Sequence, residues 1–98
     1  MKKLFLYIFL SSICFTISYA GEGLKGVYYF DLVIDQVNKG GWIIADNVLW
    51  SGKVLEEPDP KDKETIILQK FNEKVHLDSR VRNVLFPVRD GMMLMIKN

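Results

Sequence analysis

Some segments of the chain place their apolar residues at helical spacing and others are continuous apolar runs, and each change from one pattern to the other marks the boundary of an element. From residue 27 to residue 37 the apolar side chains fall at roughly helical spacing, which predicts a helix. Gly40 and Gly41 end this helix, because glycine readily adopts the left-handed conformation of a helix terminus. The apolar run at residues 42–45 follows and contains no polar alternation. It predicts a parallel strand that is buried on both faces.

An irregular loop is predicted for residues 47–62, where one glycine and two prolines interrupt any period. A helix follows, with charged residues on the face opposite its apolar stripe. Either Asp59 or Asp62 can cap its start, because a carboxylate accepts hydrogen bonds from the first free amides of a helix. The apolar positions of this helix are Ile67, Leu68, Phe71 and Val75.

Two β-forming runs, at residues 81–88 and 92–96, predict a hairpin at the end of the chain. Asp90-Gly91 lies between them, and Asp-Gly in this position is a strong turn signal. Neither run alternates with polar residues, so both strands are predicted to be buried in the same sheet as residues 42–45. The methionines of the second run are interpreted as core residues rather than soft-metal ligands. His76 has no second histidine to form a cluster and is interpreted as a surface residue.

The first 20 residues have the pattern of a secretory signal peptide. Two lysines precede a mostly apolar run over residues 4–17, which is too short to span a bilayer, and Ser18-Tyr19-Ala20 fits a cleavage site. Cleavage would remove Cys14, the only cysteine, and with it any disulfide or thiolate metal site. The sequence therefore predicts a leader at residues 1–20 and a single small domain at residues 21–98. The protein would be secreted or periplasmic if the leader is genuine, and cytoplasmic if it results from a wrong gene start.

The charge of the chain is close to zero, with or without the leader. There are 13 basic and 12 acidic residues, and removing Lys2 and Lys3 from the 13 leaves 11. The basic residues are scattered among acidic ones and form no stripe with aromatic residues. Binding to a phosphate backbone therefore has no electrostatic basis, and we predict no nucleic-acid partner.

Asp46 and Asn47 follow the predicted strand at residues 42–45 and are the first candidates for a site. In open α/β sheets, ligands bind beyond the carboxyl ends of the strands. Trp50 lies three residues further along the chain. It is either a packing residue at the exit of the strand or part of the wall of a pocket.

Several specific motifs accompany these elements, namely Ile43-Ile44-Ala45-Asp46-Asn47-Val48-Leu49-Trp50, Phe71-Asn72, Asp78-Ser79-Arg80-Val81, Val84-Leu85-Phe86-Pro87-Val88 and Asp90-Gly91. Together with the order of the elements, they resemble the class I, cation-dependent O-methyltransferases of the catechol and caffeoyl-coenzyme A type. The likeness covers residues 28–97. It implies an α/β fold, namely the C-terminal portion of a Rossmann-like S-adenosylmethionine-dependent methyltransferase fold, with a helix, a parallel strand, a helix and an antiparallel β-hairpin in that order.

The resemblance also implies the chemistry of the site. In that family an aspartate and an asparagine in this block are two of three protein ligands to a divalent cation, usually Mg²⁺, and they correspond here to Asp46 and Asn47. Oxygen ligands suit such a hard cation, which would hold two vicinal hydroxyls of a small-molecule acceptor. S-adenosyl-L-methionine would be the methyl donor. Trp50 would lie near the acceptor pocket.

The sequence departs from the family pattern before residue 28. The family's first metal-binding aspartate and the lysine proposed as its general base belong to an Asp-Ala-Asp-Lys-type motif, and residues 21–27 contain no aspartate. Lys25 aligns with that lysine only if a gap is inserted. The glycine-rich turn and the acidic residue that bind S-adenosylmethionine also have no counterpart. We therefore assign no catalytic residue and no donor-binding residue.

Three interpretations follow from this mixture of matches and departures. The favoured one is a family member made incomplete by truncation, a frameshift or a wrong start codon, and inactive in isolation. The second is a secreted, non-enzymatic remnant with a binding or structural role. The third is a fragment that associates with a separately encoded N-terminal half. A homodimer is a further form of partnership to test.

Overall fold

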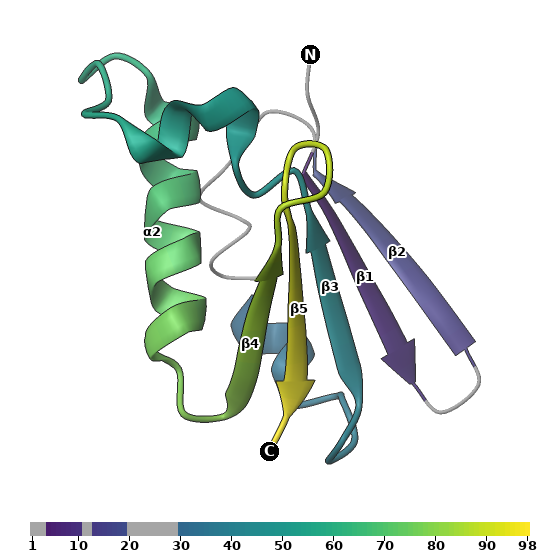
Figure 1. Cartoon of the computed structure of the whole chain (residues 1–98). Helices are drawn as coiled ribbons and strands as arrows, with labels where there is room; N and C mark the ends of the chain where they lie inside the picture. Colours follow the sequence, from purple (N-terminus) through teal and green to yellow (C-terminus); the bar gives the residue numbers. More distant parts are fainter. Residues whose placement is uncertain (1–3, 11–12, 20–29) are drawn as a thin grey trace.

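The computed structural model describes residues 4–10, 13–19 and 30–98. Within these ranges, five strands form one sheet in the order β2-β1-β3-β5-β4, and every pair is antiparallel. A helix at residues 30–34 and helix α2 (Lys63–Leu77) accompany the sheet, and the 3-10 segment η1 (Trp50–Leu55) lies between β3 and α2 (Figure 1). The strands are β1 (Leu4–Leu10), β2 (Ile13–Tyr19), β3 (Trp42–Asp46), β4 (Val81–Phe86) and β5 (Met92–Lys97).

The prediction that residues 42–45 form a parallel strand is wrong. β3 pairs antiparallel with β1 on one side and with β5 on the other. The apolar pattern of a strand reports how its faces are covered. Its direction depends on the path of the connecting chain, which the pattern does not record. The α/β class itself is correct, since helices and a sheet share one core.

One face of the sheet packs against both helices and forms the hydrophobic core. The rings of Phe30 and Phe71 meet edge to face with their centroids 6.4 Å apart, so the two helices contact each other as well as the sheet. Met93 and Met95 of β5 are buried in this core, which confirms the packing interpretation of these methionines. The core consists of Phe30, Val33, Ile34, Val37, Ile43, Ala45, Val48, Leu68, Phe71, Val75, Val81, Met93 and Met95.

The residues that the structure describes leave the opposite face of the sheet partly open. Trp42 is 47% exposed on this face, so β3 is not buried on both sides as predicted. The prediction of burial is also wrong for β4, where Val84 is 54% and Phe86 43% exposed. β4 is the last strand of the sheet and has a neighbour, β5, on one side only. Its one buried residue, Val81, lies at its start.

Helix α2 begins as the sequence predicts. The Asp62 carboxylate accepts hydrogen bonds from the Thr65 amide (3.2 Å) and the Thr65 hydroxyl (2.7 Å), and these bonds lower the pKa of Asp62. His76, near the end of α2, is exposed, which confirms its interpretation as a surface residue. The first helix covers residues 30–34 and ends earlier than the predicted residue 37. Residues 27–29 of that prediction lie outside the described residues.

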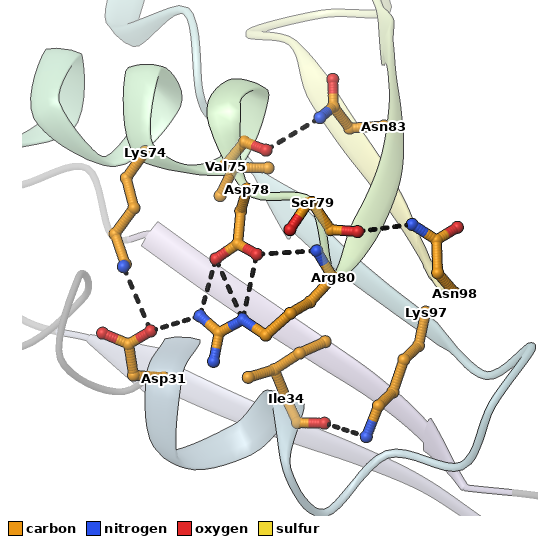
Figure 2. Close-up of polar contacts among 10 residues, drawn as sticks. All are labelled: Asp31, Ile34, Lys74, Val75, Asp78, Ser79, Arg80, Asn83, Lys97 and Asn98. Carbon is orange, nitrogen blue, oxygen red and sulfur yellow. Dashed lines mark hydrogen bonds and ion pairs between the residues drawn. The ribbon is translucent and has the colours of Figure 1, made fainter.

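Ion pairs at the end of the sheet where β4 begins join the two helices (Figure 2). Arg80 donates from Nη2 to Asp31 and to Asp78, at 2.6 Å in each case, and Nε donates to Asp78 Oδ1 at 2.9 Å. Lys74 lies 3.1 Å from the same Asp31 carboxylate. The Arg80 guanidinium also sits 5.7 Å from the centre of the Phe30 ring. This cluster connects the helix at residues 30–34 to the last turn of α2.

The predicted leader falls partly within the described residues. Strands β1 and β2 occupy much of its apolar run, and β1 pairs with β3. Ala20 and residues 21–27 lie outside the described residues. The leader and its cleavage therefore stay predictions. No helix in the described part of the chain has the length and hydropathy needed to cross a membrane.

Candidate functional site

Asp46 is the last residue of β3, and Asn47 follows it in a left-handed conformation with φ of 65°. Asparagine tolerates this conformation better than most residues. The Asn47 amide donates a hydrogen bond of 2.8 Å to Asp46 Oδ1. Both side chains are partly exposed. The two predicted ligands are therefore neighbours at the carboxyl end of β3, at the start of a sharply turning loop.

The loop after Asn47 is unusual in its backbone. Trp50, Ser51 and Gly52 also have positive φ, at 52°, 56° and 81°. Only the glycine adopts such values without steric cost, so the surrounding contacts must hold the other residues in place. Trp50 packs against the core and remains partly exposed. Packing is therefore one role of Trp50, and its predicted contact with an acceptor stays a prediction.

The turn of the β4–β5 hairpin holds this loop from one side. The Val48 amide donates to the Gly91 carbonyl (3.2 Å), the Leu49 amide to the Asp90 carbonyl (2.8 Å), and the Ser51 amide to the Asp90 side chain. Gly91 has φ of 83°, and a Cβ atom there would lie 2.5 Å from Leu49 Cγ. Only glycine allows this close approach. The sequence identifies Asp90-Gly91 as a turn, but its contact with the loop is visible only in the structure.

Helix α2 holds the same loop from the other side through two carboxamides that are three residues apart and therefore share a helix face. Asn72 Nδ2 donates to the Val48 carbonyl at 2.8 Å. Gln69 Nε2 donates to the Val54 and Glu56 carbonyls at 3.1 and 3.0 Å. Phe71-Asn72 was part of the sequence likeness, but the sequence alone gave no reason to connect Asn72 with Asp46 and Asn47.

The chemistry of this loop is that of a partial site for a hard cation. The Asp46 carboxylate and the Asn47 amide oxygen are ligands of the kind that Mg²⁺ and Ca²⁺ prefer. Mg²⁺ demands near-octahedral oxygen coordination, so two protein ligands leave most positions to other groups. Among the described residues, no group of three His, Cys, Asp or Glu side chains could hold a metal ion. The donor set fits a cation in kind but supplies only part of its coordination.

Comparison with known proteins gives a consistent result for this part of the chain. Residues 20–98 match a family model described as O-methyltransferase. The chain is 32% identical over 69 residues to the probable caffeoyl-CoA O-methyltransferase 1 of Dictyostelium discoideum. It is 33% identical over 69 residues to the catechol O-methyltransferase domain-containing protein 1 of Mus musculus, and 38% identical over 79 residues to tricin synthase 2 of Oryza sativa subsp. japonica.

These three alignments cover 70%, 70% and 71% of the chain, respectively. They cover only 30%, 26% and 26% of the relatives. The chain therefore spans less than a third of the length of these curated relatives.

Proposed function

Because the chain belongs to the O-methyltransferase family, we propose that it carries the cation-binding and acceptor-binding end of an O-methyl transfer site. The observation that carries this proposal is the Asp46–Asn47 pair at the carboxyl end of β3, where Asn47 has a left-handed conformation. Two of the relatives are named for catechol or caffeoyl-CoA methylation. A catechol-like hydroxyl compound is therefore the acceptor class that we propose.

In this proposal Asp46 supplies a charged oxygen and Asn47 a neutral oxygen to a divalent cation such as Mg²⁺. When bound, the cation would lower the pKa of an acceptor hydroxyl and orient it for attack. Trp50 follows the pair in the same loop and is partly exposed, so its indole can cover one side of the acceptor. With two protein ligands, affinity for the cation should be in the millimolar range, at the weak end for oxygen sites.

The methyl donor in this proposal is S-adenosyl-L-methionine, and no residue of the chain is assigned to bind it. Positioning of the donor against the acceptor hydroxyl provides much of the rate in such a reaction. We therefore propose that the isolated chain does not methylate catechols. In the third interpretation, a separately encoded N-terminal half is the partner that would supply a donor site.

A paramagnetic titration tests the proposed cation site. Mn²⁺, a substitute for Mg²⁺, is added to the ¹⁵N-labelled full chain, and we expect broadening of the Asp46, Asn47 and Trp50 amides at millimolar concentrations. Asp46→Ala should abolish the broadening, whereas Asp35→Ala, a change at an exposed residue outside the site, should not. Broadening that persists in Asp46→Ala would place the metal elsewhere and contradict the proposal.

A methylation assay tests the proposed inactivity. The pure chain is incubated with catechol, Mg²⁺ and S-adenosyl-L-methionine, and we expect no methylated product. Turnover that is lost in Asp46→Ala would show that the chain is a complete enzyme. Absence of both turnover and Mn²⁺ broadening would instead favour the non-enzymatic remnant with a binding or structural role.

A further inference from the structure

The peptide group between Val48 and Leu49 is fixed at both of its polar atoms by different elements. Its carbonyl accepts a hydrogen bond from Asn72 Nδ2 of α2 at 2.8 Å. Its amide donates to the Asp90 carbonyl in the hairpin turn, also at 2.8 Å. The Val48 side chain is fully buried in the core. The Val48 amide itself donates to the Gly91 carbonyl at 3.2 Å. The residue directly after Asn47 is therefore anchored through its side chain, its amide and its carbonyl.

Asn72 makes this contact at a cost to its own side chain. Its Oδ1 atom is buried and has no hydrogen-bond partner among the described residues. A buried polar atom without a partner destabilises the fold, and leucine at this position would avoid that penalty. Leucine would also leave the Val48 carbonyl without its donor, which has a cost of its own. The Asn72 side chain therefore leaves one of its own polar atoms unpaired while it provides a hydrogen bond to the loop.

We propose that Asn72 is a positioning residue for the cation-binding pair, and this inference rests on the proposed function. By holding the Val48 carbonyl, Asn72 fixes the Val48–Leu49 peptide, the second peptide group after Asn47, and so supports the left-handed conformation of Asn47. Without this contact the Val48–Leu49 peptide can rotate, Val48 is held less firmly, and Asn47 can relax toward negative φ, which most L-residues prefer. The Asn47 side chain would then move away from Asp46, and the two oxygens would no longer be placed to hold one cation together.

Gln69 provides a matched control on the same face of α2. It donates two hydrogen bonds to the loop rather than one, but to the Val54 and Glu56 carbonyls, beyond the left-handed turn. Gln69→Ala should therefore destabilise the chain at least as much as Asn72→Leu, which removes one hydrogen bond to the loop. It should leave the Val48–Leu49 peptide in place. An effect on hydrogen exchange or Mn²⁺ binding that arises only from lost overall stability will therefore be at least as large in Gln69→Ala as in Asn72→Leu.

The first measurement needs no metal. Amide hydrogen exchange at Val48 and Leu49 is compared in the full chain, in Asn72→Ala, in Asn72→Leu and in Gln69→Ala. We expect exchange at these two amides to be about fivefold faster in both Asn72 variants than in Gln69→Ala, as for the loss of one hydrogen bond. Asn72→Leu removes the unpartnered Oδ1 atom and fills its volume, so it should fold even if Asn72→Ala does not.

The second measurement is Mn²⁺ broadening of the Asn47 amide. We expect Asn72→Leu to raise the apparent dissociation constant about fivefold, again the effect of one hydrogen bond, and Gln69→Ala to leave it within about twofold. Equal weakening in both variants would reduce Asn72 to a structural role and overturn the proposal. Parent-like exchange in Asn72→Leu would also overturn it. If the parent chain shows no broadening, the proposed function fails, and the exchange data alone decide whether Asn72 positions the loop.

Discussion

The two ends of the sheet are built from different kinds of contact. At the end where β3 finishes, the loop has positive φ at Asn47 and at three of the next five residues, and hydrogen bonds to its backbone hold it in place. At the opposite end, where β4 begins, charged side chains pair with one another and with the ends of helices (Figure 2). At the first end, hydrogen bonds hold non-glycine residues in an unfavourable backbone conformation. At the other end, the contacts mainly pair charged side chains with one another.

The charged end has the character of a structural anchor. Hydrogen bonds from Arg80 lower the pKa of Asp78. Partial burial opposes ionisation of Asp31, but hydrogen bonds from Arg80 and Lys74 outweigh this effect and lower its pKa as well. Lys97 Nζ donates to the Ile34 and Val37 carbonyls at 2.7 and 2.8 Å, which satisfies one carbonyl at the end of the first helix and one three residues beyond it.

Backbone strain is concentrated at the end of the sheet where β3 finishes, and this distinguishes the candidate site from the charged anchor. Left-handed conformations of non-glycine residues cost free energy and persist where the surrounding structure enforces them, typically at functional sites. Asn47, Trp50 and Ser51 meet this description, with the hairpin turn and α2 as the enforcing elements. The abundance of charges at the other end is therefore a poorer guide to function than the conformation of this loop.

The largest effect is expected for Gly91→Ala, compared with Gly40→Ala at the other end of the sheet. Both glycines have φ near 80°, but a Cβ at Gly91 would meet Leu49, whereas nothing lies within 4 Å of the corresponding position at Gly40. We expect Gly91→Ala to lower the free energy of unfolding by about 3 kcal/mol, combining conformational cost and overpacking. Gly40→Ala should cost about 1 kcal/mol. Urea denaturation measures both, and equal losses would contradict the close-approach argument.

A smaller loss is expected for Arg80→Met, which breaks the anchor without touching the candidate site. The variant removes the hydrogen bonds to Asp31 and Asp78 and leaves two carboxylates without their shared partner. We expect the free energy of unfolding to fall by about 2 kcal/mol, within the range for hydrogen bonds to charged groups. Arg82→Met, at an exposed position of β4, should change it by less than about 0.5 kcal/mol. A changed Mn²⁺ response at Asn47 in Arg80→Met would show that the two ends are coupled.

The anchor should also make stability depend on acidity. Because the pKa values of Asp31 and Asp78 are lowered in the folded state, the unfolded chain binds protons more readily. Their contribution is complete above the ordinary aspartate pKa of about 4 and is lost as the pH falls below it. Asp78→Asn should reduce the loss of stability between pH 6 and pH 3 by about 1 kcal/mol. The difference should disappear in an Arg80→Met background, and its persistence there would assign the effect to another partner.

The sequence predicted the elements well where local chemistry decides them. Asp62 caps α2, the Asp90-Gly91 turn closes the hairpin, and Met93 and Met95 fill the core, because each depends on residues close in the chain or on burial alone. The direction of β3 and the exposure of β4 were predicted wrongly. Both depend on which strand lies beside which, and the periodicity of a single segment carries no such information.

For the candidate site, the sequence predicted the residues but not their support. Asp46 and Asn47 could be located from the end of an apolar run and from the family likeness. The contacts of Asn72 and Gly91 with the loop join positions more than twenty residues apart, so they follow from the tertiary fold. The left-handed conformation of Trp50 also has no signal in the sequence, since tryptophan does not favour it.

The smallest change in stability is expected for Asp46→Asn, at the centre of the candidate site. The new carboxamide keeps an oxygen that can accept the Asn47 amide, and the side chain is already partly exposed, so little is lost in the fold. We expect the free energy of unfolding to change by less than about 0.5 kcal/mol, as for surface substitutions. Mn²⁺ broadening at Asn47 should nevertheless weaken strongly, because the only charged ligand of the proposed pair is removed. Urea denaturation and the Mn²⁺ titration on the same sample separate the two effects. A loss of stability as large as that of Arg80→Met would mean that Asp46 is a second anchor, and that the two ends of the sheet differ less than their contacts indicate.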